Sequence, residues 1–254
     1  MNLAELVIDP YNRRARLQPA LLALLPVIVV ALVLYPELET KGATLLGIVA
    51  YLGGAAWLTQ LGRERGKRLE PDLYQDRGRM PSVALLRHRD GTISKQTKAR
   101  YHAFLSESVP HLMLPSPEDE AASPEAADDA YAAANDWLLA NTRDKDAYRL
   151  IFEENMNYGF RRNLWALKPI AIPLDILLFA GVVLLRIPMT REISAFIAAL
   201  NSPTLVALGV IIAHLILLLL ASKRWVRTTA EAYARQLLAA CDLLEKTGNN
   251  TRSA

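Results

Sequence analysis

Four long apolar stretches, separated by polar segments, organise the chain. They cover residues 17–35, 44–61, 169–185 and 204–221. An α-helix rises about 1.5 Å per residue, so each stretch is close to the roughly 20 residues that cross a hydrocarbon core of about 30 Å. A helix satisfies its own backbone polar groups in lipid. The pattern therefore predicts an all-α protein with four transmembrane helices, a helical cytoplasmic insert between helices two and three, and a cytoplasmic C-terminal helix.

A cleaved signal peptide is the alternative interpretation of the first stretch. However, acidic Glu5 and Asp9 precede it, no small-residue cleavage site follows it, and a second apolar stretch begins soon afterwards. We therefore expect the first stretch to be a membrane span.

Lysine and arginine residues near the ends of the spans predict their orientation, because cytoplasmic flanks carry an excess of them. The basic flanks are formed by Arg13, Arg14, Arg16, Arg63, Arg65, Lys67, Arg68, Arg161, Arg162, Lys168, Lys223, Arg224 and Arg227. The two remaining loops hold few cations, namely Lys41 (with Glu37 and Glu39) in one, and Arg186 and Arg191 in the other. All basic flanks fall on one side, which predicts a multi-pass protein of the bacterial inner membrane with both termini in the cytoplasm.

This layout divides the chain into four parts. Residues 1–61 are expected to form the cytoplasmic N-terminus and the first transmembrane hairpin, and residues 62–167 a helical cytoplasmic domain. Residues 168–222 are expected to form the second hairpin, and residues 223–254 a cytoplasmic helix and tail.

The composition of the chain argues against several classes of enzyme. Its 254 residues include one cysteine, Cys241, which excludes an intrachain disulfide and a cysteine-cluster metal site. The four histidines lack the spacing of metal ligands. There is no P-loop, dinucleotide-binding, HExxH or GxSxG motif. We therefore predict no catalytic residue, no metal and no cofactor.

Small residues line part of the second span. Gly47, Ala50, Gly53 and Gly54 allow another helix to approach closely. Packing within one subunit and packing between subunits are both open interpretations.

Two ionisable residues lie within the third and fourth spans. By helical rise, Asp175 lies about 10 Å from the cytoplasmic Lys168, and His214 lies about 12 Å from Ser222 at the cytoplasmic end of the antiparallel fourth span. The two side chains are therefore at nearly equal depth and can pair. Because ionisable groups are costly in a membrane and often functional there, a pore or gating role stands beside a structural hydrogen bond.

The cytoplasmic insert divides by charge. Residues 63–102 hold eleven basic and five acidic residues, whereas residues 103–160 hold three basic and twelve acidic ones. The basic half interleaves cations with aromatic side chains, as polyanion sites do, although the preference for cytoplasmic cations also accounts for it.

Short helices are expected over residues 82–89 and 94–105 of the insert, followed by a Pro- and acid-rich linker over 114–125. Further helices are expected to begin at Ser123 and at Asp144. An amphipathic tail helix is expected to continue the fourth span, packed either on the insert or on another subunit.

Two stretches, LLRHRDGTISKQTKARYH (residues 85–102) and NYGFRRNLWALKPIAI (157–172), resemble the membrane effector of Hailong-type antiphage defence systems. The resemblance covers the insert and the start of the third span, about half of the chain. It implies an oligomeric, tetrameric channel. A partner nucleotidyltransferase would make single-stranded DNA oligomers, or another nucleotide ligand, that hold the channel closed. Loss of the ligand during infection would then depolarise the membrane.

The leading hypothesis is therefore a channel effector gated by a nucleic-acid-type ligand. Its predicted ligand contacts are Arg87, Arg89, Lys95, Lys98, Arg100 and Tyr101, with Arg161 and Arg162 linking the insert to the third span. Asp175 and His214 are the predicted pore or gating residues. The alternative is a non-conducting membrane scaffold or sensor that recruits a soluble partner protein through the acidic helix and the tail.

Overall fold

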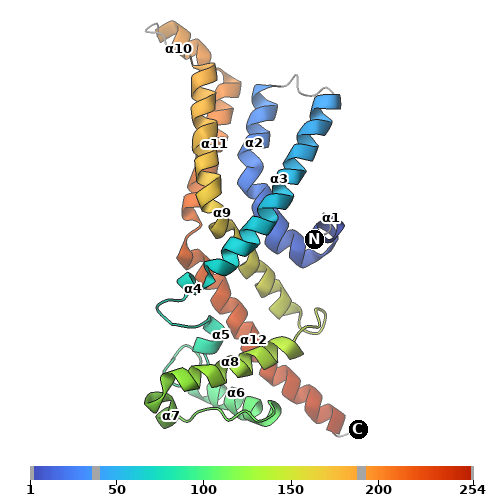
Figure 1. Cartoon of the computed structure of the whole chain (residues 1–254), viewed down its shortest axis with the longest axis vertical. Helices are drawn as coiled ribbons and strands as arrows, with labels where there is room; N and C mark the ends of the chain where they lie inside the picture. Colours follow the sequence, from blue (N-terminus) through green and yellow to red (C-terminus); the bar gives the residue numbers. More distant parts are fainter. Residues whose placement is uncertain (1–2, 36–40, 188–192, 253–254) are drawn as a thin grey trace. The chain divides into compact units, whose positions relative to one another are not determined.

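The computed structural model describes residues 3–35, 41–187 and 193–252, and these residues form helices without a strand (Figure 1). They belong to two compact units. Unit 1 comprises Met1–Leu69 and Gly159–Val226, and unit 2 comprises Glu70–Tyr158 and Arg227–Ala254. The all-α class predicted from the sequence is confirmed for the described part of the chain.

Unit 1 contains the apolar helices. Its elements are α1 (Leu3–Ile8), the π-helical turn η1 (Asn12–Leu17), α2 (Gln18–Leu34), α3 (Lys41–Arg68), most of α9 (Arg149–Arg186), α10 (Ile193–Ala199), α11 (Ser202–Leu220) and the start of α12 (Lys223–Arg252). Each of the four predicted spans falls on helix: 17–35 on the end of η1 and on α2, 44–61 on α3, 169–185 on α9, and 204–221 on α11.

Three helical segments are long and apolar enough to cross a membrane: Asn12–Leu34, Arg149–Arg186 and Ser202–Leu220. Helix α3 is not among them, and its side chains at residues 41–46 lie outside the described part. The four-span layout thus stays a prediction. The loops that hold Glu37, Glu39 and Arg191 also lie outside the described residues.

Helix α3 nevertheless shares its core with the three apolar helices. Leu58 of α3 packs in one buried cluster with Ala23 of α2, Leu167 of α9 and Leu218 of α11. Helix α2 contacts both α3 and α11. Unit 1 is therefore built around four helices, whatever the hydropathy of each.

The N-terminal π-helical turn lies very close to α9. A Cβ atom built on Gly159 would be 2.8 Å from the Cβ atom of Ala15, which leaves room only for glycine. The Asn163 Nδ2 atom donates a hydrogen bond of 2.7 Å to the carbonyl oxygen of Ala15. Ala15 and Asn163 are buried, so this contact fixes the chain before α2 against α9.

Unit 2 contains shorter helices around a separate core. Its elements are α4 (Glu70–Leu73), α5 (Pro81–Ala84), α6 (Lys95–Ser108), α7 (Pro117–Ala122), α8 (Pro124–Asn141), the start of α9 and most of α12. Leu105 of α6, Tyr131 and Leu138 of α8, and Leu237 and Cys241 of α12 share its buried cluster. The amphipathic tail helix therefore packs on the insert, one of the two arrangements that the sequence left open.

Four local predictions were wrong, and one of them is the start of α9, which begins at Arg149 and not at Asp144. Residues 85–89 form turns after the single helical turn of α5. The expected linker contains α7, which begins with a capping box between Ser116 and Asp119. The tail helix does not continue α11, because the helix breaks at Ala221 and Ser222 and restarts with the Ser222 hydroxyl oxygen accepting a hydrogen bond from the Trp225 amide.

Replacing Gly159 with alanine is expected to destabilise the protein by about 1–3 kcal/mol, because the added methyl overpacks the contact with Ala15. Gly181 of the same helix is the matched control, since its built Cβ atom has no neighbour within 4 Å. Thermal unfolding in detergent should show a lower midpoint for Gly159→Ala than for Gly181→Ala. Equal midpoints would mean that the close approach of Gly159 to Ala15 does not contribute to the stability of the protein.

Candidate functional site

A pair of ionisable side chains lies in the interior of unit 1. Asp175 comes from α9 and His214 from α11, and the His214 Nδ1 atom is 2.7 Å from the Asp175 Oδ2 atom. Asp175 is 0% exposed and His214 is 6% exposed. The pairing expected from their equal depth is present, whereas a pore or gating role stays a prediction.

The surroundings of this pair are apolar on both helices. Asp175 lies on the buried stripe of α9 between Ala171 and Val182, and His214 lies on that of α11 between Ile211 and Leu218. Burying a polar side chain is costly unless it is hydrogen-bonded, so each of these two side chains depends on the other.

The pair retains unused hydrogen-bonding capacity. Within the described part of the chain, the Asp175 Oδ1 and His214 Nε2 atoms are buried and have no hydrogen-bond partner. One carboxylate oxygen and one ring nitrogen of the pair are therefore left without a hydrogen bond in the described interior of unit 1.

The predicted ligand contacts lie mainly in unit 2, and Arg87 is buried there. Its guanidinium makes two hydrogen bonds to the Asp128 carboxylate, of 2.7 Å from Nε and 2.6 Å from Nη2, and a third to the Arg77 carbonyl oxygen. Arg87 is 7% exposed. This side chain joins the turn after α5 to helix α8.

Lys98 and Tyr101 point into the same interior. The Lys98 ammonium donates to the carbonyl oxygens of Arg87 and Asp90, which closes the turn over residues 87–90. Burial lowers the pKa of Lys98 and raises the pKa of Tyr101. Arg87, Lys98 and Tyr101 therefore build the unit, and a ligand cannot reach them without displacing their present neighbours.

The exposed members of the predicted set are Arg89, Lys95 and Arg100. The Arg89 guanidinium lies 3.5 Å from Glu120 and 3.8 Å from Asp128. Arg100 makes two hydrogen bonds, of 2.7 and 3.0 Å, to Asp242 of α12. These cations remain open to solvent, so they are the members that suit contact with a polyanion.

Arg161 and Arg162 belong to unit 1. Arg161 donates a hydrogen bond of 2.9 Å to the carbonyl oxygen of Trp225, and its guanidinium lies over the Trp225 ring. Arg162 is buried. The other six predicted ligand contacts belong to unit 2.

Internal ion pairs account for much of the charge division within the insert. Cations from the basic half meet carboxylates from α7 and α8: Arg87 meets Asp128, Arg79 meets Asp129, and Arg89 meets Glu120. The basic and the acidic segments of the insert are thus, in large part, segments that form ion pairs with each other in the fold.

Glu120 is a structurally important residue that the sequence analysis did not single out. It is 2% exposed, and its carboxylate accepts hydrogen bonds from the backbone amides of His88 (2.7 Å) and Arg89 (3.3 Å) and from the Tyr131 hydroxyl (2.7 Å). The available signal was the S-P-E-D-E run, in which Ser116 caps a helix and places one acidic residue on its inner face. Glu120 anchors the 85–92 turn to α8.

The small residues of α3 divide between two environments. A Cβ atom on Gly54 would lie 3.5 Å from Leu24 of α2, which is an ordinary contact within the chain. Gly47, Ala50 and Gly53 are exposed. Gly54 thus fits packing within one subunit. Packing between subunits remains an open interpretation for Gly47, Ala50 and Gly53.

Among residues 3–35, 41–187 and 193–252, no cluster of His, Cys, Asp and Glu side chains is arranged to hold a metal ion. No protein family, curated protein or solved structure matches the chain.

Replacing Glu120 with glutamine is expected to destabilise unit 2 by about 2 kcal/mol at neutral pH, because hydrogen bonds to a charged group are lost. Burial acts to raise the pKa of Glu120, but the hydrogen bonds from Tyr131, His88 and Arg89 outweigh it and lower the pKa below 4.5. A lowered pKa contributes stability that is present above the ordinary value and lost as pH falls through the folded value.

Thermal unfolding of Glu120→Gln and wild type should therefore differ most at neutral pH and converge as the pH falls below about 4.5. Glu118→Gln is the control, since Glu118 is an exposed residue of the same helix. A difference that is constant with pH would show that ionised Glu120 does not stabilise the unit.

Proposed function

We propose that this protein is an oligomeric inner-membrane effector of antiphage defence, a channel gated by a nucleic-acid-type ligand that binds unit 2. Opening of the channel depolarises the membrane. The observation that carries the proposal is the Asp175–His214 pair, buried between two helices that are each apolar enough to cross a membrane. Ionisable groups in such positions mark paths for ions and protons.

In the proposed arrangement, α3 is the second of four spans. Its shared core with α2, α9 and α11 supports this, because a helix packed among membrane spans must itself lie in the bilayer. The basic flanks then place both termini and unit 2 in the cytoplasm.

The ligand is proposed to be a single-stranded DNA oligomer or another nucleotide ligand supplied by a nucleotidyltransferase. This part rests on the resemblance of residues 85–102 and 157–172 and on the exposed cations Arg89, Lys95 and Arg100. A phosphate that binds Arg89 or Arg100 competes with Glu120 or Asp242 for the same guanidinium. Ligand binding then alters contacts within unit 2, which provides the differential affinity that gating requires.

Helix α9 offers the route from ligand to gate. It supplies residues 149–158 to unit 2 and residues 159–186 to unit 1, and it carries Asp175. In an oligomer, proposed to be a tetramer, the exposed Gly47, Ala50 and Gly53 of α3 provide a face for close helix packing.

A non-conducting scaffold is the second candidate function. The observation that favours it is the internal pairing of Arg87 and Lys98, which removes two cations from the surface available to a polyanion. In that case the membrane helices only anchor unit 2, and the Asp175–His214 pair serves only packing.

Expression of the wild-type protein without its proposed partner is expected to collapse the membrane potential of bacteria, measured with a potential-sensitive dye. Asp175→Asn keeps the size of the side chain but removes its charge, and is expected to slow depolarisation by about tenfold or more. Asp129→Asn, at a largely exposed position of α8, is the control for the same chemical change.

Membrane fractions from each strain establish that the variants accumulate equally. An unchanged potential on expression of wild type would contradict the channel and leave the scaffold. Equal depolarisation by wild type and Asp175→Asn would remove the pair from the conduction mechanism.

A further inference from the structure

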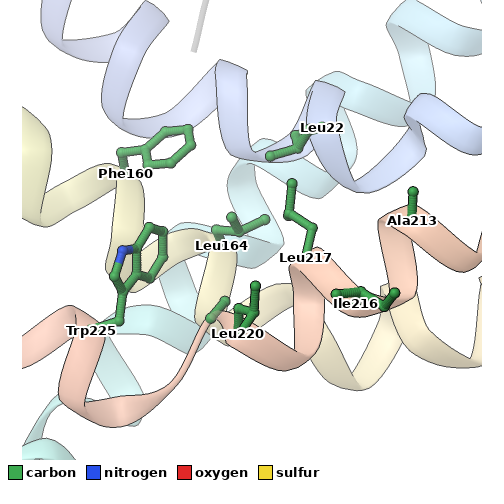
Figure 2. A pocket seen from close by; sticks show the side chains of 9 residues that line it. Leu22, Phe160, Leu164, Ala213, Ile216, Leu217, Leu220 and Trp225 are labelled. Carbon is green, nitrogen blue, oxygen red and sulfur yellow. The ribbon is translucent and has the colours of Figure 1, made fainter.

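Unit 1 contains an apolar groove that neither proposed function uses. Its volume is about 480 Å³, and the side chains that line it are drawn in Figure 2. The lining residues are Leu22 of α2, Phe160 and Leu164 of α9, Ala213, Ile216, Leu217 and Leu220 of α11, Ala221, and Trp225 of α12. The volume falls in the range of sites that hold small ligands, about 300–1,000 Å³.

The lining contains no charged side chain, so the groove suits a hydrocarbon chain. At one end, the Phe160 and Trp225 rings meet edge to face with their centroids 6.4 Å apart. Leucine and isoleucine side chains of α11 form one long wall (Figure 2). An extended apolar wall that ends at a tryptophan is the arrangement of an interfacial site, where Trp sits at the level of the headgroups.

Positive charge gathers at the tryptophan end. The Arg161 guanidinium lies 4.6 Å from the centroid of the Trp225 ring. The Lys168 Nζ atom donates a hydrogen bond of 3.0 Å to the carbonyl oxygen of Ala221, which lines the groove. Lys223 and Arg224 are exposed and lie between Ala221 and Trp225 in the sequence. Arg161 and Lys168 thus contact groove residues at this end, and Lys223 and Arg224 follow Ala221 closely in the sequence.

The positions of Lys223 and Arg224 add to this charge. They occupy the first turn of the long helix α12, where the helix dipole is positive and disfavours cations. The preference for cytoplasmic cations explains their sign, but it does not require them in a helical first turn beside a groove. An anion bound at this point is attracted both by the cations and by the helix N-terminus.

We propose that the groove binds one anionic phospholipid, with an acyl chain along α11 and the phosphate against Lys223 and Arg224. The ligand is therefore a lipid of the bilayer and not a nucleotide. This inference needs unit 1 to lie in a membrane, but it needs neither conduction nor gating.

Fluorescence of Trp225 tests the proposal in the full chain. A reporter with Trp57, Trp137 and Trp165 replaced by phenylalanine is reconstituted in phosphatidylcholine vesicles that contain a minor fraction of acyl-brominated phosphatidylglycerol or acyl-brominated phosphatidylcholine. Bromine quenches tryptophan at contact. We expect Trp225 to be quenched at a lower fraction of the anionic lipid than of the zwitterionic one.

Two variants separate the acyl and headgroup contributions. Ala213→Phe fills the groove from an exposed position and is expected to reduce quenching by the anionic lipid, whereas Ala180→Phe, at an exposed position of α9 outside the lining, is not. Lys223→Ala with Arg224→Ala is expected to lower the preference for the anionic lipid by about thirtyfold, since each of the two cations contributes about 1 kcal/mol near a membrane surface and about 1.4 kcal/mol corresponds to a factor of ten.

Lipids that copurify with the chain in its wild-type tryptophan background provide a second measurement, should the reporter fail to fold. Mass spectrometry should find bound phosphatidylglycerol in wild type and Ala180→Phe but not in Ala213→Phe. Equal quenching by both lipids would show only ordinary bilayer contact and overturn the proposal. Absence of quenching by either lipid would overturn it in favour of a protein segment, such as a second copy, in the groove.

Discussion

Asp175 and His214 each interrupt a buried apolar stripe, and neither side chain tolerates its position without the other. Their hydrogen bond of 2.7 Å joins α9 to α11. Removing one partner leaves the other polar group buried without its hydrogen bond, which costs about 1–3 kcal/mol. The bond therefore fixes the register of the two helices. The apolar contacts of Ile211, Leu218 and Val182 follow from that register.

Polar side chains that pair with each other also stabilise unit 2, and several of these pairs are partly exposed to solvent. Glu120 holds the 85–92 turn through two backbone amides and the Tyr131 hydroxyl, and Arg87 binds Asp128 through two parallel hydrogen bonds. Arg100 and Arg227 extend this pattern to α12 and to the segment after α4. The basic half of the insert is thus held by its acidic partners, and a polyanion must compete with them.

The sequence predicted the features that depend on local pattern. Apolar blocks located the helices of unit 1, and helical rise placed Asp175 and His214 at equal depth. Prediction from the sequence failed where a partner distant in the sequence decides whether a side chain is buried or exposed. Arg87 and Lys98 look like surface cations in a basic segment, but their partners lie 41 and 11 residues away. Glu120 was hidden in a segment whose prolines and acids suggest a linker, although Ser116 caps a helix there.

The break between α11 and α12 is a further case of this kind. The run from Leu220 to Trp225 contains neither proline nor glycine, so nothing local marks an end. The carbonyl oxygen of Ala221 is instead bound by Lys168 of α9, and that of Trp225 by Arg161. Tertiary contacts with α9 therefore accompany the break between α11 and α12, which the helix propensities of these residues do not predict.

Ion flux through liposomes that contain only the purified protein tests the central claim most directly. A potassium gradient and a potential-sensitive dye report conduction, and a short single-stranded DNA oligomer is added on the side that exposes unit 2. We predict that the protein alone dissipates the potential, that the oligomer suppresses this flux, and that Arg89→Ala with Lys95→Ala removes the suppression. Stable potentials in liposomes that demonstrably contain the protein, with and without the oligomer, would contradict a conducting role and leave a membrane scaffold.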